Sequence, residues 1–128
     1  MRLMILNGPN LNLSGAREPE IYGSTTLAAV HNSCKEFAAF LGASLAFEQS
    51  NYAGVLVELI QSARMTADAI IIYSFTSIAM YDALKTFAGR NIEVHGSNIH
   101  ARDELHHRPK LSGAVKGVIC GLAPSAIL

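Results

Sequence analysis

The chain has 128 residues, half of them hydrophobic, and its ten basic residues balance ten acidic ones. This length predicts a single domain, residues 1–128, with enough apolar side chains to form a core. The formal net charge of zero argues against the broad basic surface that binds nucleic acid or an anionic membrane. A small anionic substrate is still possible, because one pocket can be basic on a neutral protein.

The chain begins with a strand pattern and a long loop. Leu3–Leu6 is a continuous apolar run, which is typical of a buried strand, and it ends at Asn7. The polar, glycine-containing loop over 8–24 is long for a compact domain. We expect the part over about 13–24 to act as a lid, because glycines near both of its ends can serve as hinges.

A helix over 27–41 follows, because apolar residues recur there at spacings of three and four. We expect Ser24 or Thr25 to cap the start of this helix and Gly42 to end it. The rest of the chain continues the alternation of strands and helices. Strands are expected over 44–47, 69–72, 92–95 and 115–120, and helices over 55–63 and 78–87.

Alternation of this kind predicts a parallel sheet with helices on both faces. Five strands suit a flavodoxin-like order, so we expect an α/β, flavodoxin-like three-layer fold with a five-stranded parallel sheet. Ligands of such sheets bind beyond the carboxyl ends of the strands. Polar residues gather in the segments that follow the strands, which cover 7–12, 49–52, 73–77 and 95–106.

No apolar run is long enough to cross a bilayer, and the one at the N-terminus is too short for a signal peptide. Cys34 and Cys120 lie in apolar stretches outside any CxxC pair, which is typical of buried, reduced thiols. We therefore expect a cytoplasmic protein.

His95 is the first candidate for chemistry. It ends an expected strand, and Glu93 lies two positions earlier on the same strand face. A neighbouring carboxylate favours the protonated imidazole that a general acid needs. Gly96 and Ser97 follow and can present an N–H group and a hydroxyl to an anion. The spacing alone supports equally a strand-end histidine that caps a backbone carbonyl.

Arg17 and Tyr22 lie in the long loop. A free phenol has a pKa of about 10, too high for a base at neutral pH, and a nearby guanidinium stabilises the phenolate. The pair can therefore supply a base. Taken alone, the pattern favours an ordinary surface loop with an aromatic anchor and a solvated charge.

Several other classes of protein fit poorly. The glycines after the first strand form neither a GxGxxG fingerprint nor a Walker loop, which argues against NAD and ATP. The serines lack a GxSxG elbow, which argues against a serine hydrolase. The histidine-rich stretch over 95–107 has no nearby thiol for a closed zinc site, but it leaves a metal-dependent hydrolase as an alternative from another class.

Together these stretches resemble the type II 3-dehydroquinate dehydratase family. The likeness runs from Met4 to about Leu122, through several multi-residue motifs in the family's order. Three of the matching motifs are Asn7-Gly8-Pro9-Asn10-Leu11-Asn12, Gln49-Ser50-Asn51 and Ser97-Asn98-Ile99-His100-Ala101-Arg102. The resemblance implies a cofactor-free and metal-free lyase that dehydrates 3-dehydroquinate by anti elimination, in a dodecamer assembled from trimers.

The resemblance also implies a role for each residue of a proton-transfer set. Tyr22 would be the base, and Arg17 would hold it as a phenolate. Asn10 would help to bind the enolate oxygen. His95 would be the general acid that protonates the departing hydroxyl, and Glu93 would set its charge.

For substrate binding, the resemblance implies that Gly96 and Ser97 hold the carboxylate and that Asp82 reaches a hydroxyl across a subunit boundary. The chain departs from the family at Tyr73, where an asparagine is usual, and at His106, where an arginine is usual. The loop after Tyr73 is also several residues shorter. An active dehydroquinase is therefore expected first, a homologue for a related hydroxy-keto acid second, and an inactive homologue third.

Overall fold

The computed structural model describes residues 1–16, 24–73, 77–98 and 111–122. Strands and helices alternate along the described chain, as the sequence pattern predicts. The strands are β1 (Arg2–Asn7), β2 (Ser44–Gln49), β3 (Ala69–Tyr73), β4 (Arg90–His95) and β5 (Gly117–Cys120). The helices are the short 3-10 helix η1 (Leu11–Leu13), α2 (Leu27–Phe40), α3 (Ala53–Thr66) and α4 (Ile78–Leu84).

All strands of the described sheet are parallel, in the order β2-β1-β3-β4-β5. This is the flavodoxin-like order, so the predicted fold class is confirmed. The register aligns the carboxyl ends of the strands: Asn7 pairs with Gln49 on one side and with Tyr73 on the other. The polar segments that follow β1, β2 and β4 therefore lie along one edge of the sheet.

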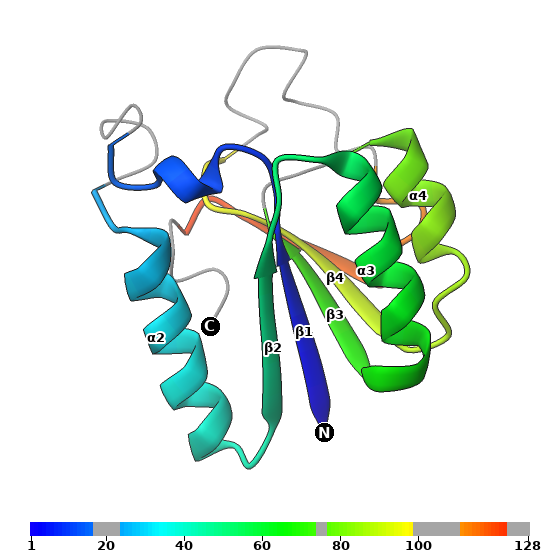
Figure 1. Ribbon diagram of the computed structural model, residues 1–128, viewed down its shortest axis with the longest axis horizontal. Helices are drawn as coiled ribbons and strands as arrows, with labels where there is room; N and C mark the ends of the chain where they lie inside the picture. Colours follow the sequence, from blue (N-terminus) through cyan, green and yellow to red (C-terminus); the bar gives the residue numbers. More distant parts are fainter. Residues whose placement is uncertain (17–23, 74–76, 99–110, 123–128) are drawn as a thin grey trace.

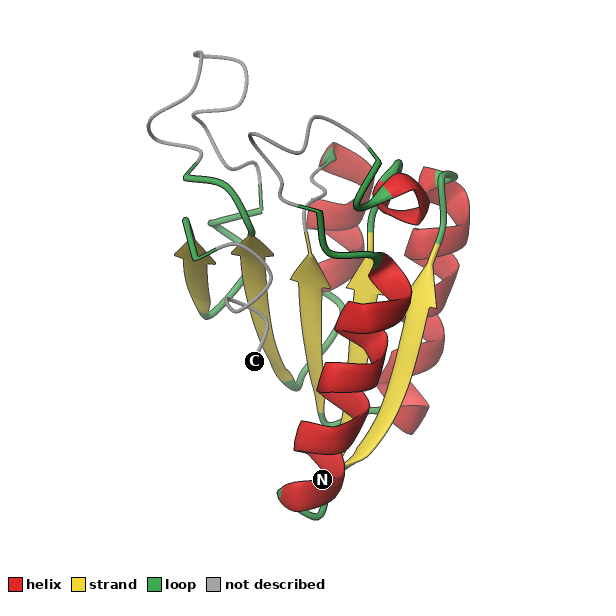
Figure 2. Ribbon diagram, turned by 90° about the vertical axis from the view of Figure 1, so that its left-hand side faces the viewer, coloured by secondary structure: helices red, strands yellow, loops and turns green. Residues whose placement is uncertain are grey.

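The sheet lies between α2 on one face and α3 with α4 on the other (Figure 1). Figure 2 shows that α2 lies in front of the middle of the sheet. On this face of the sheet, no described helix covers β4 and β5. Each face has its own buried cluster. On the side of α3 and α4 it includes Leu6, Leu56, Ile60, Ile72 and Met80, and on the side of α2 it includes Ile5, Val30, Cys34, Tyr73 and Val94.

The start of α2 differs from the expectation. Thr26, rather than Ser24 or Thr25, is the N-cap, and its Oγ1 accepts the backbone N–H of Ala29 at 3.1 Å. All three hydroxyl residues are suitable caps, so the choice depends on which turn lets the helix pack its apolar face on the sheet. Gly42 follows the last turn with φ of 72°, as expected for a glycine that ends a helix.

The end of α4 and the start of β5 also differ from the expectation, because both elements are shorter than predicted. The helix expected over 78–87 ends at Leu84, and Phe87 packs into the core from the following turn. The last strand begins at Gly117 rather than at residue 115. Before it, the amide of Asn91 holds the chain: its Nδ2 donates to Ala114 O, and its Oδ1 accepts from Lys116 N, both at 3.1 Å. The backbone N–H of Lys116 also donates to Asn91 O at 2.8 Å, so side-chain and backbone bonds together hold the start of β5 against β4.

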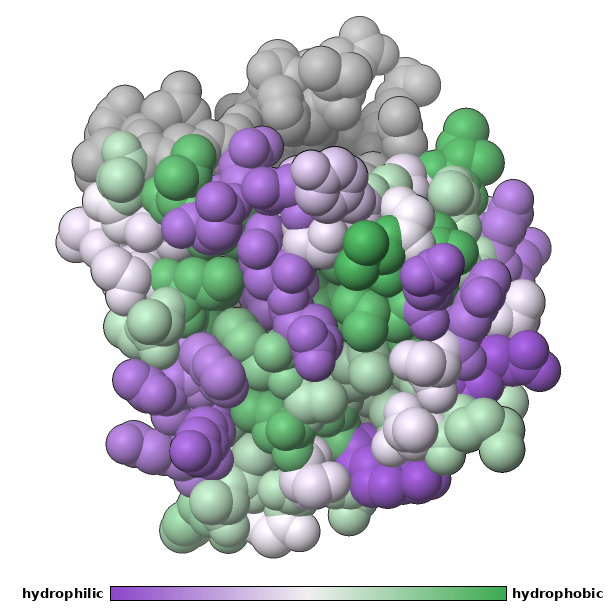
Figure 3. Space-filling view, in the orientation of Figure 1, coloured by the Kyte–Doolittle hydropathy of each residue, from purple (hydrophilic) through white to green (hydrophobic). Residues whose placement is uncertain are grey.

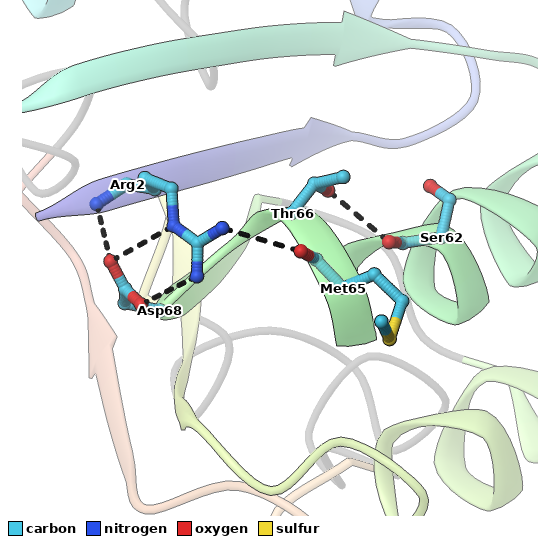
Figure 4. Close-up of polar contacts among 5 residues, drawn as sticks. All are labelled: Arg2, Ser62, Met65, Thr66 and Asp68. Atoms are coloured by element: carbon cyan, nitrogen blue, oxygen red, sulfur yellow. Dashed lines mark hydrogen bonds and ion pairs between the residues drawn. The ribbon is translucent and has the colours of Figure 1, made fainter.

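The opposite edge of the sheet carries an exposed ion pair between Arg2 and Asp68 (Figure 4). Asp68 accepts from the Arg2 guanidinium at 3.1 Å and from the Arg2 backbone N–H at 2.7 Å. These hydrogen bonds hold the pKa of the Asp68 carboxyl below its usual value. An open pocket of about 340 Å³ lies near the starts of β4 and β5, and none of the candidate site residues lines it.

Candidate active site

The carboxyl edge of the sheet collects the candidate residues that the structure describes. Figure 3 shows hydrophilic surface over the upper end of β2 and the loops beside it. Asn10 follows β1, and His95 ends β4. Because only β3 lies between these two strands, about two inter-strand spacings, roughly 10 Å, separate their ends.

The pair of His95 and Glu93 is the chemical centre of this edge. Their positions on β4 point both side chains to the face of α3 and α4, and His95 Nε2 lies 2.6 Å from Glu93 Oε1. The Glu93 side chain is fully buried, whereas that of His95 keeps 12% of its surface exposed. Burial of a carboxylate is costly unless it has a hydrogen-bond partner, and the ring of His95 supplies that partner to Glu93.

The second oxygen of Glu93 is also buried, and within the described ranges it has no hydrogen-bond partner. The chain after β4 is tied down: the N–H of Gly121 donates to His95 O at 3.2 Å. Gly96 and Ser97 follow His95 directly and are half-buried. They lie at the position from which an N–H group and a hydroxyl can reach an anion bound beside the imidazole.

Asn10 is the one described non-glycine residue in the left-handed region, with φ of 70°. Asparagine tolerates this conformation better than most residues. Its carbonyl starts η1 by accepting from Leu13 N at 2.9 Å, and its N–H donates to Asn51 Oδ1 at 2.9 Å. The Asn10 side chain is exposed and, among the residues that the structure describes, makes no capping bond.

Two other residues predicted to contact the substrate, Tyr73 and Asp82, have surroundings that differ from those of His95. Tyr73 ends β3 and is 7% exposed, and it packs with Val94 in the cluster on the α2 side. It pairs in register with Val94, so its side chain leaves the sheet on the face opposite to Glu93 and His95. Asp82 is exposed on α4. The structure therefore brings together Glu93, His95, Gly96 and Ser97, and it sets Tyr73 apart from them.

Three predicted site residues, Arg17, Tyr22 and His106, lie outside the described residues, as does most of the expected lid over 13–24. The rest of the histidine-rich stretch beyond residue 98 lies outside them too. Within the described ranges, no group of three His, Cys, Asp or Glu side chains is placed to hold a metal ion. No helix of the described part of the chain is long and apolar enough to cross a membrane.

The two cysteines differ in their surroundings. Both are free, and Cys34 is buried whereas Cys120 is half-buried. Burial raises the pKa of the Cys34 thiol. Cys120 is the register partner of His95, so its side chain leaves the sheet on the same face.

Sequence reasoning gave no role to Gln49 and Asn51, which the structure connects to the loop after β1. Asn51 binds Asn10 N, and Gln49 Nε2 donates to Gly8 O at 3.2 Å and to Asn51 Oδ1 at 3.1 Å. The signal that could have indicated a role was their place at the carboxyl end of β2, on the edge where ligands of such sheets bind.

A flavodoxin-like sheet with a buried carboxylate–histidine pair and an exposed asparagine at its carboxyl edge defines a class of protein: an α/β enzyme with an acid–base site. Comparison with known proteins gives the family. The model of the class II dehydroquinase family matches residues 1–127, so the chain belongs to this family.

The relatives agree with this assignment over most of their length. The chain is 47% identical over 126 residues to 3-dehydroquinate dehydratase 1 of Agrobacterium fabrum. The aligned region covers 95% of this chain and 87% of that protein. It is 48% identical to catabolic 3-dehydroquinase 1 of Neosartorya fischeri, with 94% and 83% covered. The crystal structure of a type II dehydroquinase from Butyrivibrio crossotus superposes with a TM-score of 0.96 at 32% identity, with 99% of this chain and 92% of that chain covered.

Proposed function

We propose that the chain dehydrates 3-dehydroquinate to 3-dehydroshikimate as a cofactor-independent hydro-lyase. The observation that carries this proposal is the buried Glu93 carboxylate 2.6 Å from the half-buried His95 imidazole at the carboxyl edge of the sheet. Membership of the class II dehydroquinase family supports it, as do relatives named 3-dehydroquinate dehydratase. Relatives of both biosynthetic and catabolic name occur, so the reaction can serve either the shikimate pathway or quinate breakdown.

The proposed elimination needs one base and one acid. Tyr22, held as phenolate by Arg17, takes the proton alpha to the ketone, and the carbon–hydrogen electrons form an enolate. The enolate then collapses and expels the hydroxyl on the next carbon, and His95 gives that hydroxyl its proton, so water leaves. The proton then on Tyr22 is lost and His95 regains one before the next cycle. The net change is loss of one water molecule.

The remaining polar residues hold the substrate. Asn10 binds the enolate oxygen, because its side chain is exposed on the loop after β1 and makes no capping bond. Gly96 and Ser97 bind the substrate carboxylate beside His95. Asp82 is exposed on α4, as a residue that reaches a neighbouring subunit must be.

Tyr73 and His106 complete the proposed binding set in place of the family's usual asparagine and arginine. Tyr73 is 7% exposed and leaves the sheet on the face opposite to His95, so its proposed contact with the substrate comes from that face. We further propose that the protein works in the cytoplasm and that trimers assemble into a dodecamer, in which the subunit boundary supplies Asp82.

The test is an ultraviolet assay of the purified chain with 3-dehydroquinate, which follows the conjugated enone of the product. The chain should form product, and Tyr22→Phe should lower kcat by roughly 100- to 10,000-fold, the usual contribution of a general base. Absence of product at high substrate concentration would overturn the proposed reaction. Binding of smaller hydroxy-keto acids would then distinguish a homologue with a shifted substrate from an inert one.

A further inference from the structure

A short chain of amides joins the end of β2 to the loop after β1. Gln49 Nε2 donates to Gly8 O at 3.2 Å and to Asn51 Oδ1 at 3.1 Å. The same Asn51 oxygen accepts the backbone N–H of Asn10 at 2.9 Å. The chain of bonds therefore begins on one backbone group of the loop and ends on another, with two side-chain amides between them.

The polarity of the two backbone groups determines how both amides are turned. Gly8 O only accepts, so Gln49 must present its nitrogen to it. Asn10 N–H only donates, so Asn51 must present its oxygen. The remaining bond, from Gln49 Nε2 to Asn51 Oδ1, is consistent with both requirements. If either amide turned over, two oxygens or two N–H groups would face each other.

Further hydrogen bonds at this edge connect the amides of Gln49 and Asn51 to the sheet. The N–H of Ser50 donates to Asn7 O at 3.2 Å, and the fully buried Asn7 donates from Nδ2 to Glu48 O at 2.9 Å. On the other side, the Ser50 hydroxyl accepts the N–H of Tyr52 at 3.0 Å, just before α3 begins. Asn51 is therefore held between the end of β2 and the start of α3.

These hydrogen bonds hold the backbone of Asn10, which is left-handed, with φ of 70° and ψ of −4°. Left-handed backbone is unfavourable for a residue with a side chain unless its surroundings hold it. The hydrogen bond that Asn10 N–H donates to Asn51 Oδ1 helps to hold it, while the Asn10 carbonyl accepts from Leu13 N. The backbone conformation of Asn10 sets the direction in which its side chain leaves the loop.

We propose that Asn51, oriented by Gln49, is a positioning residue that fixes Asn10 for binding of the enolate oxygen. The inference rests on the proposed function, in which Asn10 meets the oxyanion. Loss of the Asn51 acceptor releases the backbone of Asn10, and its amide then swings away from the point where charge develops. A misplacement of about 1 Å at such a group costs up to roughly 100-fold in rate.

Three variants of the purified chain test the direction of the bonds. Asn51→Ala removes the acceptor and should lower kcat for 3-dehydroquinate by roughly 10- to 100-fold, with KM changed less than about threefold. Asn51→Asp keeps an acceptor at the same place and should recover most of that kcat. Gln49→Glu puts a carboxylate against Gly8 O and Asn51 Oδ1, so Asn51 must turn over and Asn10 loses its acceptor. Its kcat should fall as in Asn51→Ala.

Two control substitutions elsewhere in the chain distinguish a loss of positioning from a general loss of folding. Asn32→Ala on the exposed face of α2 repeats the truncation, and Gln61→Glu on the exposed face of α3 repeats the change from amide to carboxylate. Both should keep the parental kcat. Thermal unfolding of all five variants should stay within a few degrees of the parent, because the Asn51 bonds lie at an exposed surface.

The outcomes distinguish this inference from the proposed function. If the parent forms no product, the proposed reaction fails and the inference fails with it. If the parent is active and Asn51→Ala keeps its kcat, only the inference fails. It also fails if Asn51→Asp and Asn51→Ala lose kcat equally, because an acceptor role predicts rescue. An active parent with the predicted order of kcat values supports both.

Discussion

Nε2 of His95 lies 2.6 Å from Oε1 of Glu93, and the two side chains leave β4 on the same face. The Glu93 side chain is fully buried, whereas its partner His95 keeps 12% of its side-chain surface exposed. A hydrogen bond between a buried carboxylate and a histidine is charge-assisted when the histidine is protonated. The contact with Glu93 holds the His95 ring in place at the carboxyl end of β4.

Glu93→Gln tests this relationship. The amide keeps the volume and one hydrogen bond, but its neutral oxygen stabilises the imidazolium less than a carboxylate does. We expect kcat for 3-dehydroquinate to fall by roughly 10- to 100-fold, a part of what a general acid supplies. Steady-state kinetics across pH measure it. A parental kcat throughout the pH range would show that Glu93 has no electrostatic role.

Asp68→Asn should reduce stability at neutral pH and change it little in acid. The pKa of Asp68 is lower in the folded chain than in the unfolded one, chiefly because its carboxylate accepts from Arg2. Stability from this group is therefore fully present above the unfolded value of about 3.9 and disappears as pH falls through the folded value.

Urea unfolding of the parent and of Asp68→Asn at pH 7 and at low pH measures this effect. The two midpoints should differ at pH 7 and converge in acid. Because the ion pair is exposed, added salt should also shrink the difference. A difference that stays constant with pH would contradict an electrostatic origin.

Two glycine substitutions should change stability in opposite directions. A Cβ at Gly89 would lie 2.5 Å from the backbone oxygen of Asp68 and 2.6 Å from the Phe87 ring. Gly89→Ala should therefore cost about 1–3 kcal/mol of unfolding free energy. Gly54 lies in α3 with nothing within 4 Å of the same atom. Gly54→Ala should add up to about 1 kcal/mol, because alanine loses less backbone entropy in a helix. Equal effects would contradict the steric argument.

Iodoacetamide should modify Cys120 before Cys34. The Cys34 thiol is 5% exposed, and burial raises its pKa, so both access and thiolate content are reduced. Cys120 is half-buried at the end of β5. Mass spectrometry of peptides from the folded chain measures the two rates, and denatured chain is the control. Faster modification of Cys34 would contradict the packing of α2 on the sheet.

Most of the fold could be predicted because strands and helices leave different periods in the sequence. The apolar, β-branched run over 69–72 predicted a strand, which the structure extends to Tyr73, and the alternation of elements predicted the flavodoxin-like strand order. The cap of α2 could not be predicted, because three neighbouring hydroxyl residues precede the helix and only tertiary packing selects Thr26.

The candidate site divides in the same way. The pair of Glu93 and His95 could be predicted, since residues two apart on a strand always share a face. The bond from Asn10 N to Asn51 could not, because it depends on the pairing of Asn7 with Gln49 across two strands far apart in the sequence. The surroundings of Tyr73 follow from its pairing with Val94, which places it with the α2 cluster.

The strand order also has a consequence for biosynthesis. After β1 has paired with β2, β3 joins the free edge of β1, and β4 and β5 each join the strand formed before them, so no strand must insert between two that are already paired. A chain that emerges from the ribosome can therefore extend its sheet in step with translation. Asn10 and Asn51 follow β1 and β2, which are made first, whereas His95 lies at the end of β4, which is made later. A ribosome that pauses after β3 would leave the apolar edge Ala69–Tyr73 unpaired, where nascent chains are most prone to associate.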